Sequence, residues 1–245
     1  MKNREDLRIL LLQIRQDSVV RQEEVASFCR YANLSSVQID VFNVFDHPTF
    51  DQKILANYDA LFIGGASEAS VLKPDQFPFI QPSIDLVQAC VESSFPTFAS
   101  CFGFQLAILA FGGEIIRDES DFEMGTIPIE LTEAAKRDPV YQGIPNHFKA
   151  VSVHQEKCLQ LPGNCQLLAY TNSCTHSFKV VDRPFWAFQF HPELDRPTLT
   201  ERLGVYRDQY TEDAEHFNAI FDGLEETPDS NLLLENFVDR VLLKS

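Results

Sequence analysis

Cys101, His191 and Glu193 are the residues of this 245-residue chain whose types and surroundings best suit covalent chemistry. A cysteine attacks a carbonyl carbon as a nucleophile when a base accepts its proton. A histidine serves as that base and later protonates the leaving group, because its ordinary pKa lies near neutrality. A carboxylate on the other ring nitrogen fixes the histidine tautomer and stabilises the protonated ring. We therefore expect Cys101 to be the nucleophile, His191 the base and Glu193 the orienting carboxylate.

Cys101 lies where a predicted strand gives way to a predicted helix. Residues 95–100 have an apolar, strand-like pattern, and residues 102–111 are expected to form a helix that is apolar nearly all round. A sharp turn of this kind exposes a nucleophile at the sheet edge, and Gly103 relieves the crowding there. The N-terminus of the helix favours the thiolate, which is the reactive form. The alternative is a structural cysteine, the role that we expect for Cys29, Cys90, Cys158, Cys165 and Cys174.

His191 ends an apolar strand over residues 185–190 and is followed by Pro192-Glu193. The alternative for such a histidine is a strand end followed by a turn proline, which is how we interpret His47. No motif surrounds the following histidines, for which we expect structural roles: His147, His176 and His216.

A candidate oxyanion hole follows another predicted strand, which ends at Gly64-Gly65. Attack on an amide creates a negative oxygen that needs backbone N–H donors held in place. We expect those donors to be the N–H groups of Gly65 and Phe102. Taken alone, a strand followed by two glycines indicates only a turn.

The elements that position these residues alternate between strand and helix in the first half of the chain. Strands are expected over residues 8–14, 37–44, 60–63 and 95–100, and helices over 18–33, 82–93 and 102–111. This alternation predicts an α/β fold with a mostly parallel central sheet and helices on both faces. Shorter strands are expected over 114–117, 126–131, 165–170, 177–181 and 185–190, and they predict a small mixed or antiparallel extension.

The chain after His191 is expected to be helical again. One helix is expected over residues 199–210. A last helix is expected from an N-cap at Ser230 through Leu243, with Leu232, Leu233, Phe237 and Val241 as its apolar stripe. No linker or repeat interrupts the chain, so we expect a single domain over 1–245, with a core over 8–194 and a helical C-terminal extension over 195–245.

Composition excludes several classes of function. The net charge of −16 argues against binding to nucleic acid, and the apolar run at 9–12 is too short for a signal peptide or a membrane span. We therefore expect a cytoplasmic protein with free thiols and no membrane contact. No Cys-x-x-Cys pair is present, and the sequence predicts no metal site and no cofactor.

Three motifs together resemble the class I (triad) glutamine amidotransferase family, and most closely its GMP-synthase-type glutaminase domain. They are Gly64-Gly65, Cys101-x-Gly103-x-Gln105 and His191-Pro192-Glu193, in that order within residues 8–194. The resemblance implies a flavodoxin-like fold and cleavage of a glutamine amide through a γ-glutamyl thioester on Cys101. It also implies that Gln105 contacts the bound substrate.

Two further stretches resemble the family and would flank the pocket: Glu123-Met124-Gly125 and the histidine-containing loop Val153-His154-Gln155. Other positions depart from it, because Ser100 and Phe104 replace residues common at the elbow. Ala66-Ser67-Glu68 also replaces the proline-led sequence that often follows Gly-Gly. None of these departures removes a member of the triad.

The resemblance leaves three functions open. The first is a stand-alone, glutaminase-type amidotransferase that hydrolyses L-glutamine and passes ammonia to a separate synthetase. The sequence has no P-loop-like glycine-rich cradle, and the 51 residues from Asp195 are too few for an ATP-dependent acceptor domain. The second is a γ-glutamyl hydrolase or peptidase that uses the same triad on γ-glutamyl peptides. The third is a non-catalytic regulatory or binding protein with a relic site, against which the intact triad argues.

Overall fold

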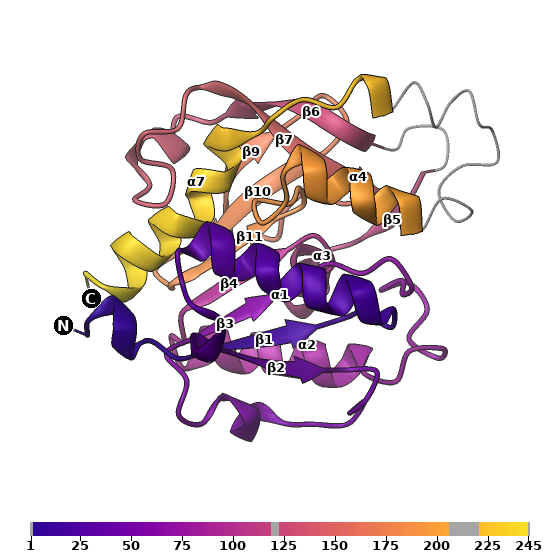
Figure 1. Ribbon diagram of the computed structural model, residues 1–245, viewed down its shortest axis with the longest axis vertical. Helices are drawn as coiled ribbons and strands as arrows, with labels where there is room; N and C mark the ends of the chain where they lie inside the picture. The colour runs from indigo at the N-terminus through magenta and orange to yellow at the C-terminus, as the bar shows by residue number, and fades with distance from the viewer. Residues whose placement is uncertain (1, 119–122, 206–220, 245) are drawn as a thin grey trace.

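A computed structural model describes residues 2–118, 123–205 and 221–244. Within these residues, a central nine-stranded sheet has the order β2-β1-β3-β4-β11-β10-β9-β6-β7, and β5 and β8 form a separate antiparallel pair. Figure 1 shows α1, α4 and α7 on one face of the sheet, with α2 and α3 on the other. The predicted α/β fold, with a mostly parallel sheet and an antiparallel extension, is confirmed.

The first half of the chain contains β1 (Ile9–Gln13), α1 (Ser18–Ala32), β2 (Ile39–Asn43), β3 (Ala60–Ile63), α2 (Ile80–Glu92), β4 (Thr97–Ser100) and α3 (Phe102–Ala110). The second half contains β5 (Ile116–Arg117), β6 (Glu123–Leu131), β7 (His147–His154), β8 (Glu156–Lys157), β9 (Cys165–Tyr170), β10 (Thr175–Val180), β11 (Phe185–Phe188), α4 (Arg196–Val205), α7 (Pro228–Phe237) and the π-helical turn η5 (Val238–Leu242).

The parallel strands are buried on both faces, which explains their continuous apolar sequences. Side chains alternate between the faces of a strand, so Ile9 and Leu11 of β1 pack beneath α1 and α7, whereas Leu10 and Leu12 pack beneath α2 and α3. Phe62 of β3 and Phe98 of β4 enter the first of these cores. Each fully buried side chain of this size contributes about 1.5–3 kcal/mol. The two cores fix the register that places the ends of β3, β4 and β11 side by side.

Helix α1 has clear signals at both ends. Asp17 accepts hydrogen bonds from the backbone N–H groups of Val19 and Val20 as its N-cap. Asn33 ends the helix in the left-handed conformation, with φ of 52°. These caps account for the close match between α1 and the helix expected over residues 18–33.

The antiparallel part of the sheet is larger than predicted, because β7 was not expected. Residues 153–155 were expected in a loop, but β7 continues through His154 and pairs along its whole length with β6. Buried Phe148 and Ala150 alternate with exposed His147 and Lys149, and this period of two was the available signal. The strand expected over 185–190 is also shorter than predicted, since β11 ends at Phe188. It pairs in parallel with β4 on one side and antiparallel with β10 on the other, so it joins the two parts of the sheet.

The prediction for the last helix is wrong in its N-cap and in part of its stripe. The helix begins at Pro228 after an N-cap at Thr227, because a proline at the first helical position needs no N–H partner. Ser230 therefore lies inside the helix, where it is buried. Leu232 is 44% exposed, and Leu234 takes its place on the buried face. The helix expected over 199–210 is α4, and residues 206–210 lie outside the described part of the chain.

The helices of the described segments include none that is both long and apolar enough to cross a membrane.

Candidate active site

Cys101 lies at a strained turn between β4 and α3. Its φ of 48° and ψ of −94° fall outside the regions that residues with side chains ordinarily adopt. The turn is close-packed, since a Cβ on Gly103 would lie 2.9 Å from Cβ of Ile63 and 3.1 Å from Cβ of Ala99. Glycine at this position lets α3 start directly against the strands. The predicted strand-to-helix elbow is therefore present, with Cys101 as the N-cap residue of α3.

The structure brings His191 and Glu193 to the same end of the sheet. β11 pairs in parallel with β4, and the backbone N–H of His191 donates to the carbonyl oxygen of Val151 on β7. Nδ1 of His191 lies 2.7 Å from Oε1 of Glu193, and both side chains are buried. The other carboxylate oxygen of Glu193 accepts a 2.7 Å hydrogen bond from Oγ of Ser100. The carboxylate thus holds the imidazole from one side.

Charges around His191 favour its protonated form. Burial by itself would lower the pKa of His191, but the charges of Cys101 and Glu193, and hydrogen bonds with both, raise it to about 9. Burial would likewise raise the pKa of Glu193, but the charge of His191 and hydrogen bonds from His191 and Ser100 lower it. A protonated imidazole between a thiol sulfur and a carboxylate is poised to donate a proton to a leaving group.

The two residues expected to supply the oxyanion donors both lie next to Cys101. Phe102 is the first residue of α3, so its N–H has no partner within the helix. At Gly65, an added Cβ would lie 2.8 Å from Cε1 of His191 and 3.5 Å from Cβ of Cys101. The backbone at Gly65 therefore approaches the triad as closely as a residue without a side chain allows.

A pocket opens beside the sulfur of Cys101. Its lining residues come from the loop after β3, from α3, and from β5 to β8. Gln105 is buried in this wall, and its side-chain amide donates a 3.1 Å hydrogen bond to the carbonyl oxygen of Glu156. The carbonyl oxygen of Val153 lies 3.9 Å from Sγ of Cys101. Cys101 and Gln105 of the predicted elbow thus line one cavity, together with the residues that follow the glycine pair and with His154.

Sequence similarity identifies the family. A family model described as "Glutamine amidotransferase class-I" matches residues 25–202, which is more than half of the chain. This chain belongs to the class I glutamine amidotransferase family.

Among curated relatives, this chain is 28% identical over 164 residues to γ-glutamyl peptidase 4 of Arabidopsis thaliana. It is 30% identical over 118 residues to a subunit of the glutamine-hydrolysing GMP synthase of Methanococcus aeolicus. The first match covers 66% of this chain and 64% of the relative, and the second covers 48% and 61%. The chain therefore spans less than two thirds of the length of each of these relatives.

Solved structures share the fold. A glutamine amidotransferase from Thermotoga maritima aligns with a TM-score of 0.77 at 16% identity, covering 98% of this chain and 99% of that protein. A protein from Thermoplasma acidophilum, described as a GMP synthase subunit, gives a TM-score of 0.66 at 17% identity and covers 95% and 92%.

Two residues that were not predicted as part of the site contact the predicted triad, and a third, Arg15, lines a small pocket together with His191. Ser100 contacts Glu193, and the side-chain amide of Gln189 lies 3.8 Å from Sγ of Cys101. Arg15, which is buried, donates to Glu24 at 2.9 Å and to Oγ of Ser67 at 2.9 Å. Gln189 directly precedes Phe190-His191, and this position beside the motif was the one available signal. Arg15 follows the carboxyl end of β1, far from the motifs in the sequence.

The Arg15–Glu24 ion pair explains why two glycines follow β3. A Cβ on Gly64 would lie 2.7 Å from Oε1 of Glu24, and one on Gly65 would lie 3.0 Å from Nη2 of Arg15. Gly64 thus packs against the carboxylate of Glu24, and Gly65 packs against the guanidinium of Arg15 and the imidazole of His191.

A second cluster lies behind one wall of the pocket and joins residues from separate strands. Glu123 begins β6, His154 ends β7, and Cys174 and His176 lie at the start of β10. One potential ligand atom from each of these four residues lies within 4.8 Å of all the others. Burial lowers the pKa of His154, which favours its neutral ring. Cys174 and His176 were expected to have structural roles because nothing in their local spacing links them to Glu123 or His154.

Replacing Ser100 with alanine tests whether its hydroxyl positions the carboxylate. Loss of one hydrogen bond to a charged group is expected to reduce kcat by about tenfold and to lower the pKa seen in the kcat profile. The pKa falls because Glu193 then holds the protonated imidazole less well. Steady-state rates from pH 5 to 10 provide the measurement, with exposed Ser36→Ala as the control. An unchanged pH profile would show that Ser100 does not act through Glu193.

The raised pKa of His191 makes stability depend on pH. A folded pKa of about 9 against an ordinary value of 6.5 means that the folded state binds the proton more tightly. This stabilisation is fully present below about pH 6.5 and is lost as the pH rises through 9. Urea unfolding at pH 6.5, 8 and 9.5 should show a steeper loss of unfolding free energy for the natural protein than for His191→Gln. Parallel curves for the two proteins would contradict the assignment.

Proposed function

We propose that this class I amidotransferase hydrolyses the side-chain amide of L-glutamine, with Cys101 as the nucleophile. The observation that carries the proposal is that Cys101 lines the pocket and forms a hydrogen bond with His191, whose other ring nitrogen lies 2.7 Å from Oε1 of Glu193. Among the residues that the structure describes, no other cysteine lines that pocket. The family assignment supports an amidohydrolase, and the geometry supports this cysteine.

The proposed reaction proceeds in two halves. The thiolate of Cys101 attacks the amide carbon, a C–S bond forms, and the oxygen becomes negative between the N–H groups of Gly65 and Phe102. The C–N bond then breaks as the imidazolium of His191 gives its proton to the leaving ammonia. Water attacks the γ-glutamyl thioester as His191 accepts a proton from it. The C–S bond breaks, and glutamate and the cysteine are released.

Two charged residues in the lining of the pocket support recognition of an amino acid. Arg117 and Glu156 both line the pocket, with Nη1 of Arg117 lying 4.0 Å from Oε1 of Glu156. A glutamine backbone carries a carboxylate and an ammonium group, so an adjacent pair of opposite charges matches both. Gln105, on the same lining, is proposed to contact the substrate near the reacting amide.

Replacing Arg117 with glutamine is expected to raise KM for glutamine about tenfold with little change in kcat. The expected size reflects the loss of a charged hydrogen bond to the substrate carboxylate, which is bound equally in the ground and transition states. Initial rates over a glutamine series measure both constants, with exposed Arg137→Gln as the matched control. A fall in kcat at constant KM would place Arg117 outside the substrate site.

A second candidate is a γ-glutamyl hydrolase or peptidase, which is favoured by the similarity to γ-glutamyl peptidase 4. The thioester step is the same and only the leaving group differs. The similarity to the GMP synthase subunit instead favours a separate synthetase that accepts ammonia. The proposed contacts to the γ-glutamyl group would serve both substrates, and we place glutamine hydrolysis first because the matching family model is that of the class I glutamine amidotransferases.

Substrate profiling of the purified chain separates the candidates. Glutamine and a panel of γ-glutamyl dipeptides are incubated with the protein, and ammonia, glutamate and released amino acids are measured. Ammonia from glutamine supports the first candidate. Cleavage of the peptides with background ammonia supports the second. If neither is cleaved, and a glutamine-analogue electrophile also fails to label Cys101, the enzymatic proposal is wrong. Glutamine hydrolysis that rises on addition of extract from the source cells supports a partner synthetase.

A further inference from the structure

Four buried or partly buried side chains, separated widely in the sequence, direct donor atoms at one another behind the pocket. Oε2 of Glu123 lies 3.0 Å from Nε2 of His154 and 2.7 Å from Nε2 of His176. Sγ of Cys174 lies 3.4 Å from Nε2 of His176 and 3.8 Å from Oε2 of Glu123. The set offers one oxygen, two nitrogens and one sulfur.

These separations match the edges of a tetrahedral metal site. Zinc bonds of about 2.0–2.3 Å to oxygen, nitrogen and sulfur place neighbouring ligand atoms roughly 3.3–3.7 Å apart. The four separations given above run from 2.7 to 3.8 Å, and the remaining two, from His154 to Cys174 and to His176, are at most 4.8 Å, so the four donors lie close to the spacing that a central ion requires.

Burial and hydrogen bonding indicate that the cluster is more than a set of paired side chains. His154, Cys174 and His176 are at most 7% exposed. Nε2 of His154 is buried and lies 3.0 Å from Oε2 of Glu123, but it is not aligned for a regular hydrogen bond with that oxygen. A buried nitrogen without a well-aligned partner is costly, and a bound metal ion would satisfy it. The other oxygen of Glu123 accepts a 2.9 Å hydrogen bond from Thr171, which orients the carboxylate as the outer partners of metal ligands do.

The charges of the four donors also suit a divalent ion. One carboxylate and one thiolate carry two negative charges, and two neutral imidazoles carry none, so a bound divalent cation would leave the buried site neutral. Mixed sulfur, nitrogen and oxygen donors in a closed set of four are typical of zinc.

We propose that Glu123, His154, Cys174 and His176 form a structural zinc site. Binding forms four metal–ligand bonds and releases the thiol proton of Cys174 to solvent. Because all four ligands come from the protein, no position is left for substrate. The site ties the start of β6 and the end of β7 to the turn between β9 and β10.

The proposed zinc site would stabilise one wall of the catalytic pocket. His154 lines that pocket, and the carbonyl oxygen of the preceding Val153 lies 3.9 Å from Sγ of Cys101. Met124, which follows Glu123, lines it as well. Fixing Glu123 and His154 therefore fixes the segments that face the nucleophile.

The metal content of the full-length chain tests the proposal. The protein is purified without a histidine tag, incubated with zinc chloride, freed of excess metal by gel filtration and analysed by elemental mass spectrometry. About one zinc ion per chain is expected in the natural protein. The same amount is expected in Cys101→Ala, which cannot bind zinc through the Cys101–His191 pair. Cys174→Ser, His176→Gln and Glu123→Gln should each retain less than about a tenth of that amount.

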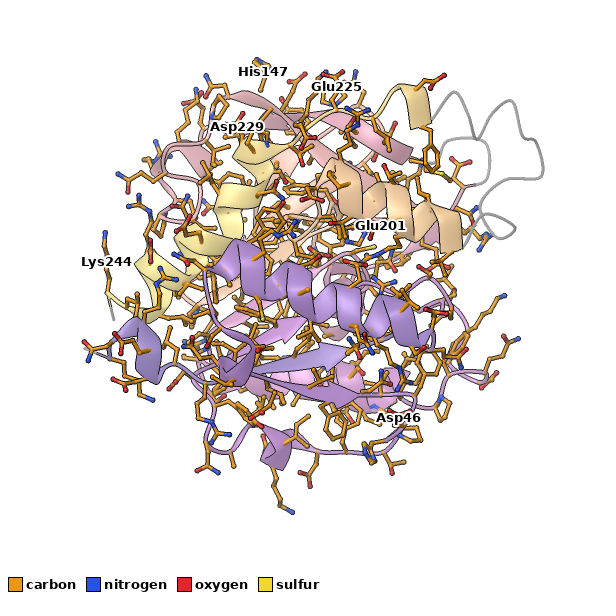
Figure 2. The ribbon with its side chains drawn as sticks, in the orientation of Figure 1. Asp46, His147, Glu201, Glu225, Asp229 and Lys244 are labelled. Carbon is orange, nitrogen blue, oxygen red and sulfur yellow. The ribbon has the colours of Figure 1, made fainter. Side chains whose placement is uncertain are left out.

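Matched controls separate the cluster from other thiols and imidazoles. Cys29→Ser removes a half-buried thiol on α1, and His147→Gln removes an exposed imidazole on the same strand as His154. Figure 2 shows His147 at the periphery of the molecule, and both controls should bind zinc as the natural protein does. A cobalt-loaded Cys101→Ala sample should show a thiolate-to-cobalt charge-transfer band and the d–d bands of a tetrahedral site. This spectrum does not depend on whether the ligand variants fold.

Several results would overturn the proposal. One is absence of stoichiometric zinc in both the natural protein and Cys101→Ala. Another is loss of the metal in Cys101→Ala, which would place it on the catalytic pair. A third is full metal content in Cys174→Ser. A cobalt spectrum without thiolate bands, or a melting temperature unaffected by a chelator, would show that the cluster is a hydrogen-bonded network. None of these results bears on whether Cys101 cleaves glutamine, which substrate profiling decides separately.

Discussion

Cys101→Ala is expected to lose at least about 10⁴-fold in the rate of amide hydrolysis, with the fold unchanged. Alanine removes the sulfur that would attack the carbonyl carbon. The methyl group that remains cannot act as a nucleophile in its place. The side chain of Cys101 is buried and small, so its truncation leaves the packing of α3 on β3 and β4 nearly intact. Ammonia release from glutamine provides the rate, and circular dichroism with thermal unfolding reports the fold.

Two comparisons make the result decisive. Cys29→Ala, on α1, removes a thiol of similar size away from the pocket and should retain full activity. Glu193→Ala should cost less than Cys101→Ala, because orienting the imidazole is a smaller effect than supplying the nucleophile. A Cys101→Ala protein that keeps more than about a hundredth of the natural rate would show that another group attacks the amide.

Gly65→Ala is expected to reduce kcat by about 10²–10³-fold, which is the scale of losing one oxyanion donor. The new Cβ would lie 2.8 Å from Cε1 of His191, closer than real Cβ contacts, and 3.0 Å from Nη2 of Arg15, which is also unusually tight. Neither neighbour can yield freely, because Arg15 is held by Glu24 and Ser67, and His191 is held by Glu193. The backbone N–H of residue 65 and the imidazole must therefore move apart.

Kinetics and structure together test the Gly65 prediction. The loss should appear in kcat more than in KM, because the oxyanion exists only during the reaction. Gly163→Ala is the matched control, since a Cβ there meets nothing within 4 Å and its φ is not positive. Natural kcat in Gly65→Ala, with unfolding also unchanged, would remove Gly65 from the oxyanion hole.

Local patterns in the sequence predicted the elements that carry the site. Unbroken apolar runs such as residues 9–12 indicated strands buried on both faces, and the structure divides those residues between two cores. The caps at Asp17 and Asn33 delimit α1 closely because they satisfy the ends of a helix locally. The last helix was harder, since the chain offers both Pro228 and Ser230 as starting residues, and the helix begins at the proline.

Contacts between distant segments were less predictable. β7 carries a period-two pattern, but its pairing partner β6 is set by the sheet rather than by the strand itself. Ser100 was noted only as an unusual residue before the cysteine, and its bond to Glu193 depends on β4 and β11 lying side by side. Arg15 reaches the glycine pair because β1 lies beside β3.

The sequence by itself determined the family, the α/β class and the three motifs from which a triad and an oxyanion hole could be proposed, because these depend on residue type and short spacing. Only the tertiary structure decided that Ser100 supports Glu193, that an ion pair requires Gly64-Gly65, and that four donors from β6, β7 and the start of β10 converge. The physical reason is that side-chain geometry across a sheet depends on strand order and register. These follow from the packing of the whole core, and no local spacing in the chain encodes them.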